Sequence, residues 1–338
     1  MRRGGALVVL GVLLLAAVLL AVGVGAVWIS PTTTVRLVSW KLGLAERPAG
    51  VPRSVEIILF QLRIPRVLLA AVVGSALAAA GTVFQALFRN PLADPAIIGV
   101  SSGAALGAVA AMLLAGGGLV VPAAAFLGAL MTGLLVYRIA RIGPAVQVAT
   151  LLLAGIAVAA VISAVMALVL TYSGERIRSI YFWLLGGLSA RSWESLAAAA
   201  PIAAVGMATA LGTVGHLNLV ALGEERAAQL GLEVERFKRG ALATGALLAG
   251  AAVAVGGVIG FVGLMTPHLL RLVLGADHRR LLPASLLGGA VFMVLADLAA
   301  RTVRAPEEIP VGAVTALLGG PFFLYLLRRQ RREAGARA

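Results

Sequence analysis

The chain has 338 residues, of which 61% are hydrophobic and 12% are charged, and its formal net charge is +14. Soluble domains carry about 25% charged residues, so this composition excludes an ordinary soluble fold and predicts an all-α integral membrane protein. The sequence contains no cysteine, which excludes disulfides, thiolate metal sites and a cysteine nucleophile.

Each transmembrane helix needs roughly 20 apolar residues. Turn residues and charges divide the chain into ten apolar segments, so we expect about ten transmembrane helices in one polytopic domain over residues 1–338. The segments cover residues 6–29, 65–88, 96–115, 121–140, 149–172, 195–214, 239–258, 260–275, 282–303 and 310–327. The first is longer than the roughly 7–15 residues of a signal-peptide core, so we interpret it as a retained span.

An even number of spans puts both termini on one side of the membrane. Basic residues at both ends (Arg2, Arg3, Arg328, Arg329, Arg331 and Arg332) place that side in the cytoplasm. The positive charge is therefore attributed to membrane topology, and no nucleic-acid partner is expected. Several basic residues fall in the predicted outer loops, namely Arg36, Lys41, Arg47, Arg53, Arg63, Arg66, Arg176, Arg178, Arg191, Arg301 and Arg304. Either a long first loop crosses the membrane regardless of charge, or these residues form a basic surface for an acidic partner.

Small residues in the predicted spans indicate close helix contacts. Gly99, Gly103 and Gly107 are spaced four apart and form one smooth ridge in the third span. Gly74, Ala78, Thr82 and Gln85 give the second span a similar face.

Ionisable residues inside the predicted spans are few, and this argues against ion coupling. Asp297 lies toward the outer part of the ninth span, and Arg301 follows one turn later, so a structural pair is expected. His268 has no nearby carboxylate and is interpreted as a packed side chain. Neither lysine, Lys41 nor Lys238, stands in a P-loop motif, so a carrier built this way needs energy from another chain.

A dense run of charges interrupts the apolar sequence between Gly223 and Gly240. A multispan protein that keeps a compact, partly helical charged loop in water usually keeps it for another protein. We therefore predict a cytoplasmic partner-binding loop near residues 216–238.

Four further segments narrow the interpretation: Arg63-Ile-Pro-Arg66, the run from Gln85 to Ala104 with Asn90-Pro91-Leu92-Ala93-Asp94-Pro95, the run from Gly260 to Arg271, and Ile309-Pro-Val-Gly312. Together they closely resemble the FecCD family of permeases, from about Arg63 to the C-terminus. The resemblance implies a ten-span subunit used as a homodimer with the pore at the interface of the two copies. It also implies two separate ATP-binding subunits on the cytoplasmic side and a substrate-binding protein on the outer side.

The resemblance also implies residue roles. The family's ATPase contact falls on Gly223, Glu224, Glu225, Arg226, Ala228, Gln229, Leu230 and Gly231. Its binding-protein dock falls on Arg63, Arg66 and Arg301, although Arg63 or Arg66 could instead anchor the second span at the interface. Its cytoplasmic gate falls on Gln147, Val148, Ala149 and Thr150. The segment from Arg178 to Ser189 resembles the family's short outer helix.

The leading hypothesis is a permease subunit of the inner (cytoplasmic) membrane that imports a bulky metal chelate, driven by ATP hydrolysed on a partner. Ferric siderophore or haem is the first choice of cargo, and cobalamin is the alternative. No catalytic residue, metal site or cofactor is expected on this chain, since ATP and Mg²⁺ belong to the partner. An ion-coupled secondary carrier is the alternative from another class, and it would need acidic residues or broken helices at the bilayer midplane. An intramembrane enzyme is a third possibility, for which the sequence offers no catalytic set.

Overall fold

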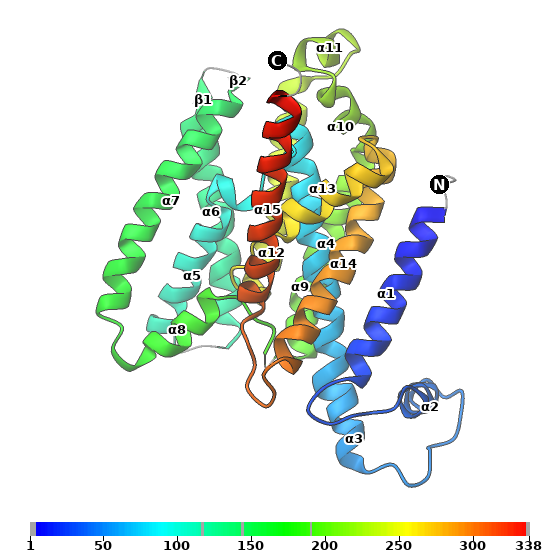
Figure 1. Ribbon diagram of the computed structural model, residues 1–338. Coiled ribbons are helices and arrows are strands. Elements are labelled where there is room, and N and C mark those ends of the chain that lie inside the picture. Colours follow the sequence, from blue (N-terminus) through cyan, green and yellow to red (C-terminus); the bar gives the residue numbers. More distant parts are fainter. Residues whose placement is uncertain (1–4, 116–117, 143–144, 190, 336–338) are drawn as a thin grey trace.

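The computed structural model describes residues 5–115, 118–142, 145–189 and 191–335, and most of them form a bundle of long helices (Figure 1). Seven helical segments in this part of the chain are long and apolar enough to cross a membrane. They are α1 (Gly5–Gly23), the continuous helix α3 (Arg53–Ile57), η1 (Ile58–Arg63) and α4 (Ile64–Leu87), then α6 (Val120–Ala140), α7 (Val148–Thr171), α9 (Trp193–Gly212), α12 (Val234–Gly256) and α14 (His278–Thr302). Three shorter apolar helices are α5 (Val100–Leu114), α13 (Val262–Leu274) and the first part of α15 (Val311–Gly335).

Short elements connect the long helices. They are α2 (Pro31–Lys41), η2 (Pro95–Ile98), η3 (Gly174–Arg176), α8 (Ile177–Leu184), α10 (Val214–Ala221) and α11 (Glu224–Gln229). Two-residue strands β1 (Arg141–Ile142) and β2 (Ala145–Val146) form an antiparallel ladder in which Arg141 is opposite Val146. Helix α8 corresponds to the predicted short outer helix, whereas α2 and the ladder were not predicted.

The observed helices follow the ten predicted apolar segments, with differences at their ends. Helix α1 stops at Gly23 although the apolar run continues to Ile29. The third segment is divided at Gly99, whose φ of 76° ends η2 before α5 begins. Helices α12 and α14 begin earlier than the apolar stretches, at Val234 and His278. A helix can include polar residues beyond its apolar stretch. Hydropathy alone therefore places the first residues of α12 and α14 too late in the sequence.

Helix α4 lies in the core, and its neighbours approach it through glycines. A Cβ atom on Gly74 would lie 2.1 Å from the carbonyl oxygen of Gly289 in α14. The predicted ridge on α5 packs in the same way against α6, where a Cβ on Gly103 would lie 2.4 Å from the oxygen of Gly128. At both sites backbones touch directly, so a side chain at either glycine would push the helices apart.

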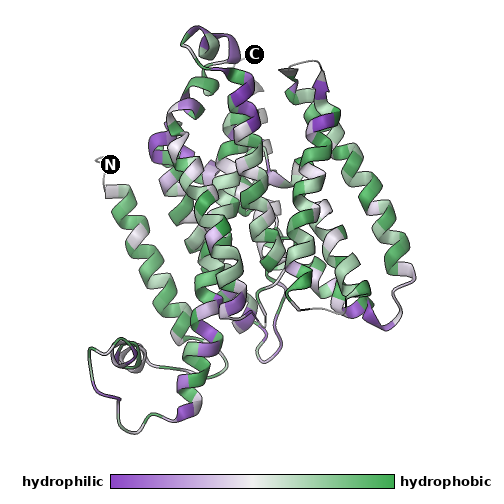
Figure 2. Cartoon of the chain, turned by 180° about the vertical axis from the view of Figure 1, so that it is seen from behind, coloured by the Kyte–Doolittle hydropathy of each residue, from purple (hydrophilic) through white to green (hydrophobic). Residues whose placement is uncertain are grey.

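Polar residues gather at the two ends of the bundle, and apolar residues fill the length between them (Figure 2). One end carries α10, α11 and the β1–β2 ladder, and we call it the α11 end (Figure 1). The other carries α2, α3 and α8, and we call it the α8 end. The first described turn of α1 and the last described turn of α15 both point toward the α11 end. The placement of both termini on the cytoplasmic side of the membrane stays a prediction.

Candidate functional sites at the two ends of the bundle

Helix α11 projects from its end of the bundle as a short, separate element (Figure 1). Gly223 precedes it with a φ of 113°, and Gly231 follows it with a φ of 87°, so the chain turns sharply on both sides. Ala227 is fully buried and attaches the helix to the body. Leu230 is 62% exposed. The remaining predicted contact residues Glu225, Arg226, Ala228, Gln229 and Gly231 are also exposed, while Glu224 is half-buried. The predicted coupling residues therefore form one compact surface.

Lys238, in the first turns of α12, is the buried charge next to this surface. Lys238 is 4% exposed. The Nζ atom donates to Glu224 Oε2 at 2.6 Å, to Glu235 Oε1 at 3.0 Å and to the carbonyl oxygen of Val146 at 3.2 Å. Glu235 also accepts a hydrogen bond from the backbone N–H of Val146 at 3.0 Å. From the sequence, Lys238 served only to exclude a P-loop, because the contact with Val146, 92 residues away, carries no local signal.

The four predicted gate residues begin α7 at the same end of the bundle. Gln147 stands at the N-cap position of α7, and Thr150 Oγ1 lies 3.5 Å from Gln147 Oε1. Val148 and Thr150 are half-buried, and Ala149 is exposed. The structure thus brings the predicted gate close to the Lys238 contacts through Val146, which directly precedes it.

The three arginines predicted to dock a binding protein lie together at the α8 end. Arg63 is buried, and its guanidinium donates to the carbonyl oxygens of Val22 and Gly23 at 2.9 and 2.8 Å. Arg301 donates to the carbonyl oxygen of Val24 at 3.0 Å and to that of Ala21. A helix leaves its last four carbonyls without partners, and cations near them are favourable. Arg63 and Arg301 therefore cap α1, which accounts for its end at Gly23.

Arg66 makes a different set of contacts, with two carboxylates. Its Nη2 atom lies 2.9 Å from Asp297 Oδ1, and its Nη1 atom lies 2.7 Å from Glu308 Oε1. Asp297 is 1% exposed and also pairs with Arg301 at 3.5 Å, which confirms the predicted structural pair. The Arg66 contact, made across 231 residues, was not predicted. All three guanidinium groups thus face partners within the chain, and the docking role stays a prediction.

Glu308 joins this arginine cluster to the loop after α8. Ser189 donates its hydroxyl to Glu308 Oε2. Burial of the carboxyl acts to raise the pKa of Glu308, but the hydrogen bonds from Arg66 and Ser189 outweigh it and hold the pKa below the ordinary 4.5. Glu308 therefore stays ionised at neutral pH and keeps its ion pair with Arg66.

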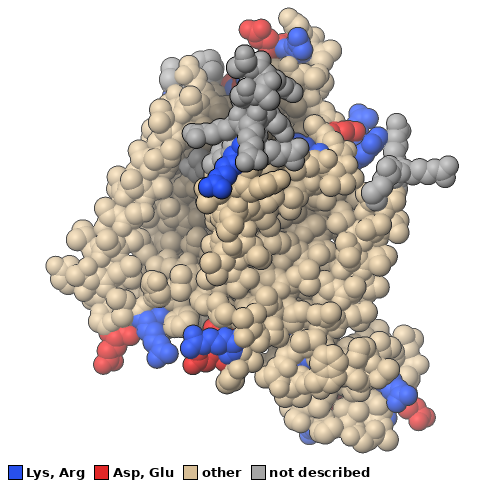
Figure 3. Space-filling view, viewed as in Figure 1, with Lys and Arg blue, Asp and Glu red and all other residues tan. Residues whose placement is uncertain are grey.

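A cavity of about 380 Å³ opens beside Glu308 at the α8 end, between α8 and the segment before α15. Phe182 and Trp183 supply its apolar wall, while Ser189 and Arg191 supply polar atoms. The face of the molecule between α7 and α15 is hollowed, and charged side chains border it near both ends (Figure 3). Within the described chain no three His, Asp or Glu side chains gather as a metal site. His268 is buried and packs edge-on against Phe322 at 6.2 Å, as a packed histidine should.

The fold and its polar ends define a multispan helical membrane protein with a separate projecting helix. The FecCD transport family model matches residues 13–329, and the chain belongs to this family. It is therefore an ABC transporter permease, a transport subunit rather than an enzyme.

Named relatives and one solved structure support this assignment. The chain is 47% identical to the cobalamin import system permease protein BtuC of Halobacterium salinarum, over 84% of this chain and 77% of that one. It is 46% identical to the hemin transport system permease protein HmuU of Yersinia pestis, over 82% and 84%. The fold is similar to a solved structure described as an inward-facing conformation of a metal-chelate type ABC transporter, with a TM-score of 0.84, 32% identity and coverage of 96% and 98%.

Proposed function

We propose that this chain is the ten-span permease subunit of an ABC importer of the inner membrane. In this proposal it works as a homodimer with two ATP-binding subunits on the cytoplasmic side and a substrate-binding protein on the outer side. The α11 end faces the cytoplasm, and the cargo moves inward between the two copies. ATP and Mg²⁺ are bound by the partner subunits.

The projecting surface of α11 is the observation that carries this proposal. Its exposed leucine, Leu230, and its flanking charges stand away from the apolar bundle, so another protein can bind them without displacing a packed side chain. The β1–β2 ladder and the start of α7 lie at the same end (Figure 1). A partner that moves α11 is therefore near the proposed gate at Gln147, Val148, Ala149 and Thr150.

The hollow between α7 and α15 supports a pore at the interface of two copies (Figure 3). Helix α7 carries large exposed apolar side chains, among them Leu153 at 69% and Val161 at 64% exposure. Helix α15 does the same with Leu317 at 74%. A second copy facing this side would enclose a wide, mostly apolar passage with few fixed charges, which suits a bulky chelate.

The cargo is assigned as a metal chelate, with ferric siderophore or haem and cobalamin as the candidates. The relatives named for cobalamin and for hemin are almost equally identical to this chain, at 47% and 46%. A relative from Bacillus subtilis named as an Fe(3+)-citrate import system permease is 37% identical over 97% of this chain. The three chelates should therefore be compared directly.

The ion-coupled alternative would need Asp297 as its proton-binding carboxylate, and this structure pairs Asp297 with two arginines. Asp297 is held by Arg66 at 2.9 Å and by Arg301 at 3.5 Å. A carboxylate that must bind and release a proton during each cycle cannot be committed to two guanidinium groups. The pairs instead give Asp297 a structural role, which leaves ATP on a partner as the energy source.

Reconstituted uptake tests the function. The permease is placed in proteoliposomes with the ATP-binding subunit and the binding protein encoded beside it, and uptake of haem, a ferric siderophore and cobalamin is measured. We expect uptake of one chelate class that requires internal ATP and continues after an uncoupler collapses the proton gradient. Uptake that proceeds without ATP and stops with the uncoupler would replace this proposal with an ion-coupled carrier.

A further inference from the structure

The Lys238 ammonium group joins three separate pieces of the chain. Glu224 is the first residue of α11, Glu235 lies one turn earlier on α12, and Val146 immediately precedes the N-cap of α7. An ammonium group has three N–H donors, and the structure gives Lys238 Nζ three acceptors, one from each piece. All three N–H donors of the ammonium group therefore have a protein acceptor.

Two side chains of α12 bind the backbone of Val146, the residue before the N-cap of α7. Lys238 donates to the carbonyl oxygen of Val146, and Glu235 accepts from the N–H of the same residue at 3.0 Å. Val146 is 3% exposed, so both of its backbone groups are satisfied away from water by side chains of α12. A buried backbone group that loses its partner keeps the full cost of its removal from water. Val146 therefore has a strong preference to move together with these two side chains.

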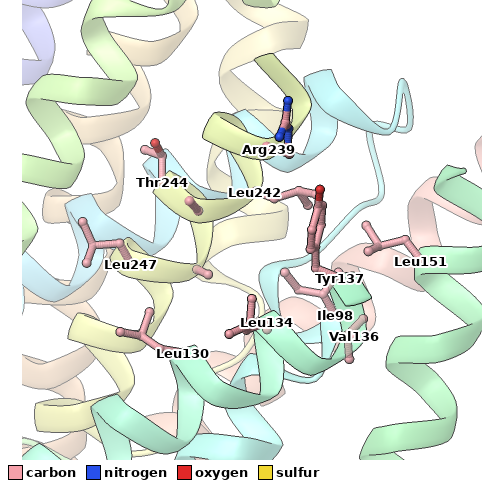
Figure 4. A pocket seen from close by; sticks show the side chains of 13 residues that line it. Ile98, Leu130, Leu134, Val136, Tyr137, Leu151, Arg239, Leu242, Thr244 and Leu247 are labelled. Carbon is pink, nitrogen blue, oxygen red and sulfur yellow. The ribbon is translucent and has the colours of Figure 1, made fainter. Parts of the chain in front are cut away.

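Directly below these contacts, the start of α7 is not packed tightly against α12. A cavity of about 550 Å³ separates them, with Leu151 of α7 on one side and Leu242 and Arg239 of α12 on the other (Figure 4). Tyr137 of α6 lines it as well. Close-packed side chains transmit displacement, whereas a cavity leaves room for one element to move independently. At this level the polar contacts, rather than packing, tie α7 to α12.

We propose that Lys238 is a positioning residue that ties α11 to the first turn of α7, so that a displacement of α11 is passed to the gate. This inference rests on the proposed function, in which α11 contacts the ATPase and α7 begins at the gate. A displacement of α11 reaches Lys238 through Glu224, and it reaches the start of α7 through Val146. Glu235 keeps both contacts in register because it binds Lys238 and Val146 at once.

The test separates assembly, ATP hydrolysis and gate movement. Lys238→Met removes the three donors but keeps an unbranched side chain that is one atom shorter. Arg236→Met is the matched control, since Arg236 lies two residues away on the same helix and is 78% exposed in its pair with Glu233. Because the chain has no cysteine, Gln147→Cys can report the gate, and Glu225→Cys can report the ATPase contact, by rates of alkylation with and without ATP. Uptake and ATP hydrolysis are measured on chains that lack these two cysteines.

In the parent complex and in Arg236→Met, we expect ATP to change the alkylation rate at position 147 and uptake to follow hydrolysis. In Lys238→Met the ATPase should still protect position 225, because the outer face of α11 is unchanged. The rate at the gate should become independent of nucleotide, and uptake per ATP should fall by about tenfold. A purely structural lysine would lower the amount of folded complex without changing uptake per ATP.

Glu224→Gln is the second variant, because it leaves Lys238 with Glu235 and Val146 and weakens its link to α11. Since Glu224 also belongs to the predicted ATPase contact, the ATPase must protect position 225 in this variant as it does in the parent. It should fold like the parent and lower uptake per ATP by a smaller factor, about threefold. Unchanged coupling in both variants overturns the role of Lys238, as does unchanged coupling in Glu224→Gln if Lys238→Met does not fold. A parent complex that shows neither ATPase protection nor ATP-dependent uptake instead overturns the proposed function itself, and this inference with it.

Discussion

The two ends of the bundle use their charged residues in opposite ways. At the α8 end, Arg63 and Arg301 donate to carbonyls of α1, and Arg66 binds Asp297 and Glu308. At the α11 end, most charges of α11 stand in water. The difference bears on the two predicted partner contacts. Helix α11 is exposed as it stands, whereas docking at Arg66 would require Arg66 to exchange one of its own carboxylates.

The largest effect is expected at the α11 end. Leu230→Asp places a charge on the exposed apolar side chain of the proposed ATPase contact and should abolish uptake and co-purification of the ATPase. Insertion of the permease should be unchanged, because Leu230 is 62% exposed and supports no core contact. Leu44→Asp is the control, since Leu44 is 77% exposed between α2 and α3 at the other end. Normal ATPase binding by Leu230→Asp would remove α11 as the contact.

The next effect should appear at the α8 end as a loss of stability. Arg301→Met leaves buried carbonyls of α1 without a partner, and we expect it to lower the free energy of unfolding by about 3 kcal/mol. Arg304→Met is the matched control one turn along the chain, since Arg304 is 73% exposed in its pair with Glu307, and it should change stability by less than about 0.5 kcal/mol.

Chemical unfolding of the purified permease measures both variants, and binding-protein association is measured on the folded fraction. If Arg301→Met keeps the parent's stability but loses the binding protein, the docking role predicted from the sequence is right and the capping role is minor. If stability falls and the folded fraction still binds, Arg301 acts through α1.

The contrast between the ends also explains what the sequence could reveal. Apolar runs predicted the long helices, and the spacing of four between Gly103 and Gly107 predicted their tight packing, because both signals are local. The pair of Asp297 and Arg301 was found for the same reason. The end of α1 at Gly23 could not be predicted, because it depends on arginines supplied by η1 and α14.

Long-range polar contacts limited the prediction of the sites as well. The motif placed Arg66 at an outer surface, but its partners Asp297 and Glu308 are more than two hundred residues away in the chain. Lys238 likewise meets Val146 across 92 residues. A charged residue in a membrane protein can face water, lipid or another helix, and only the packing of helices decides among these.

A smaller effect, on the affinity for the binding protein, tests the docking hypothesis. Glu308 occupies Arg66 Nη1 at 2.7 Å, in the manner that a carboxylate of a binding protein would. Glu308→Gln weakens this internal competitor, so we expect the binding protein to bind about threefold more tightly at low salt. Glu307→Gln is the matched control, because the adjacent Glu307 is 70% exposed and pairs only weakly, with Arg304. The affinities are measured on immobilised permease. Equal affinities for both variants would mean that Arg66 takes no part in docking.

The smallest effect is the pH dependence of the same contact. The pKa of Glu308 is lowered from 4.5 in the folded chain by the hydrogen bonds from Arg66 and Ser189, which outweigh the opposing effect of burial. A carboxyl with a lowered folded pKa adds stability that is present above its unfolded pKa and is lost as the pH falls through the folded value. The stability difference between the parent and Glu308→Gln should therefore be constant from neutral pH down to about pH 5 and shrink below it.

Because Glu308 is 36% exposed, that difference should stay below about 1 kcal/mol and decrease further in high salt. Unfolding of both proteins at matched pH and salt measures it. A difference that grows on acidification would have the wrong sign for an ionised Glu308 bound to Arg66. In that case Arg66 would keep only its contact with Asp297 at neutral pH, and its Nη1 group would be open to a partner. A difference that shrinks means that Glu308 is ionised and bound to Arg66, so a docking carboxylate would have to displace it.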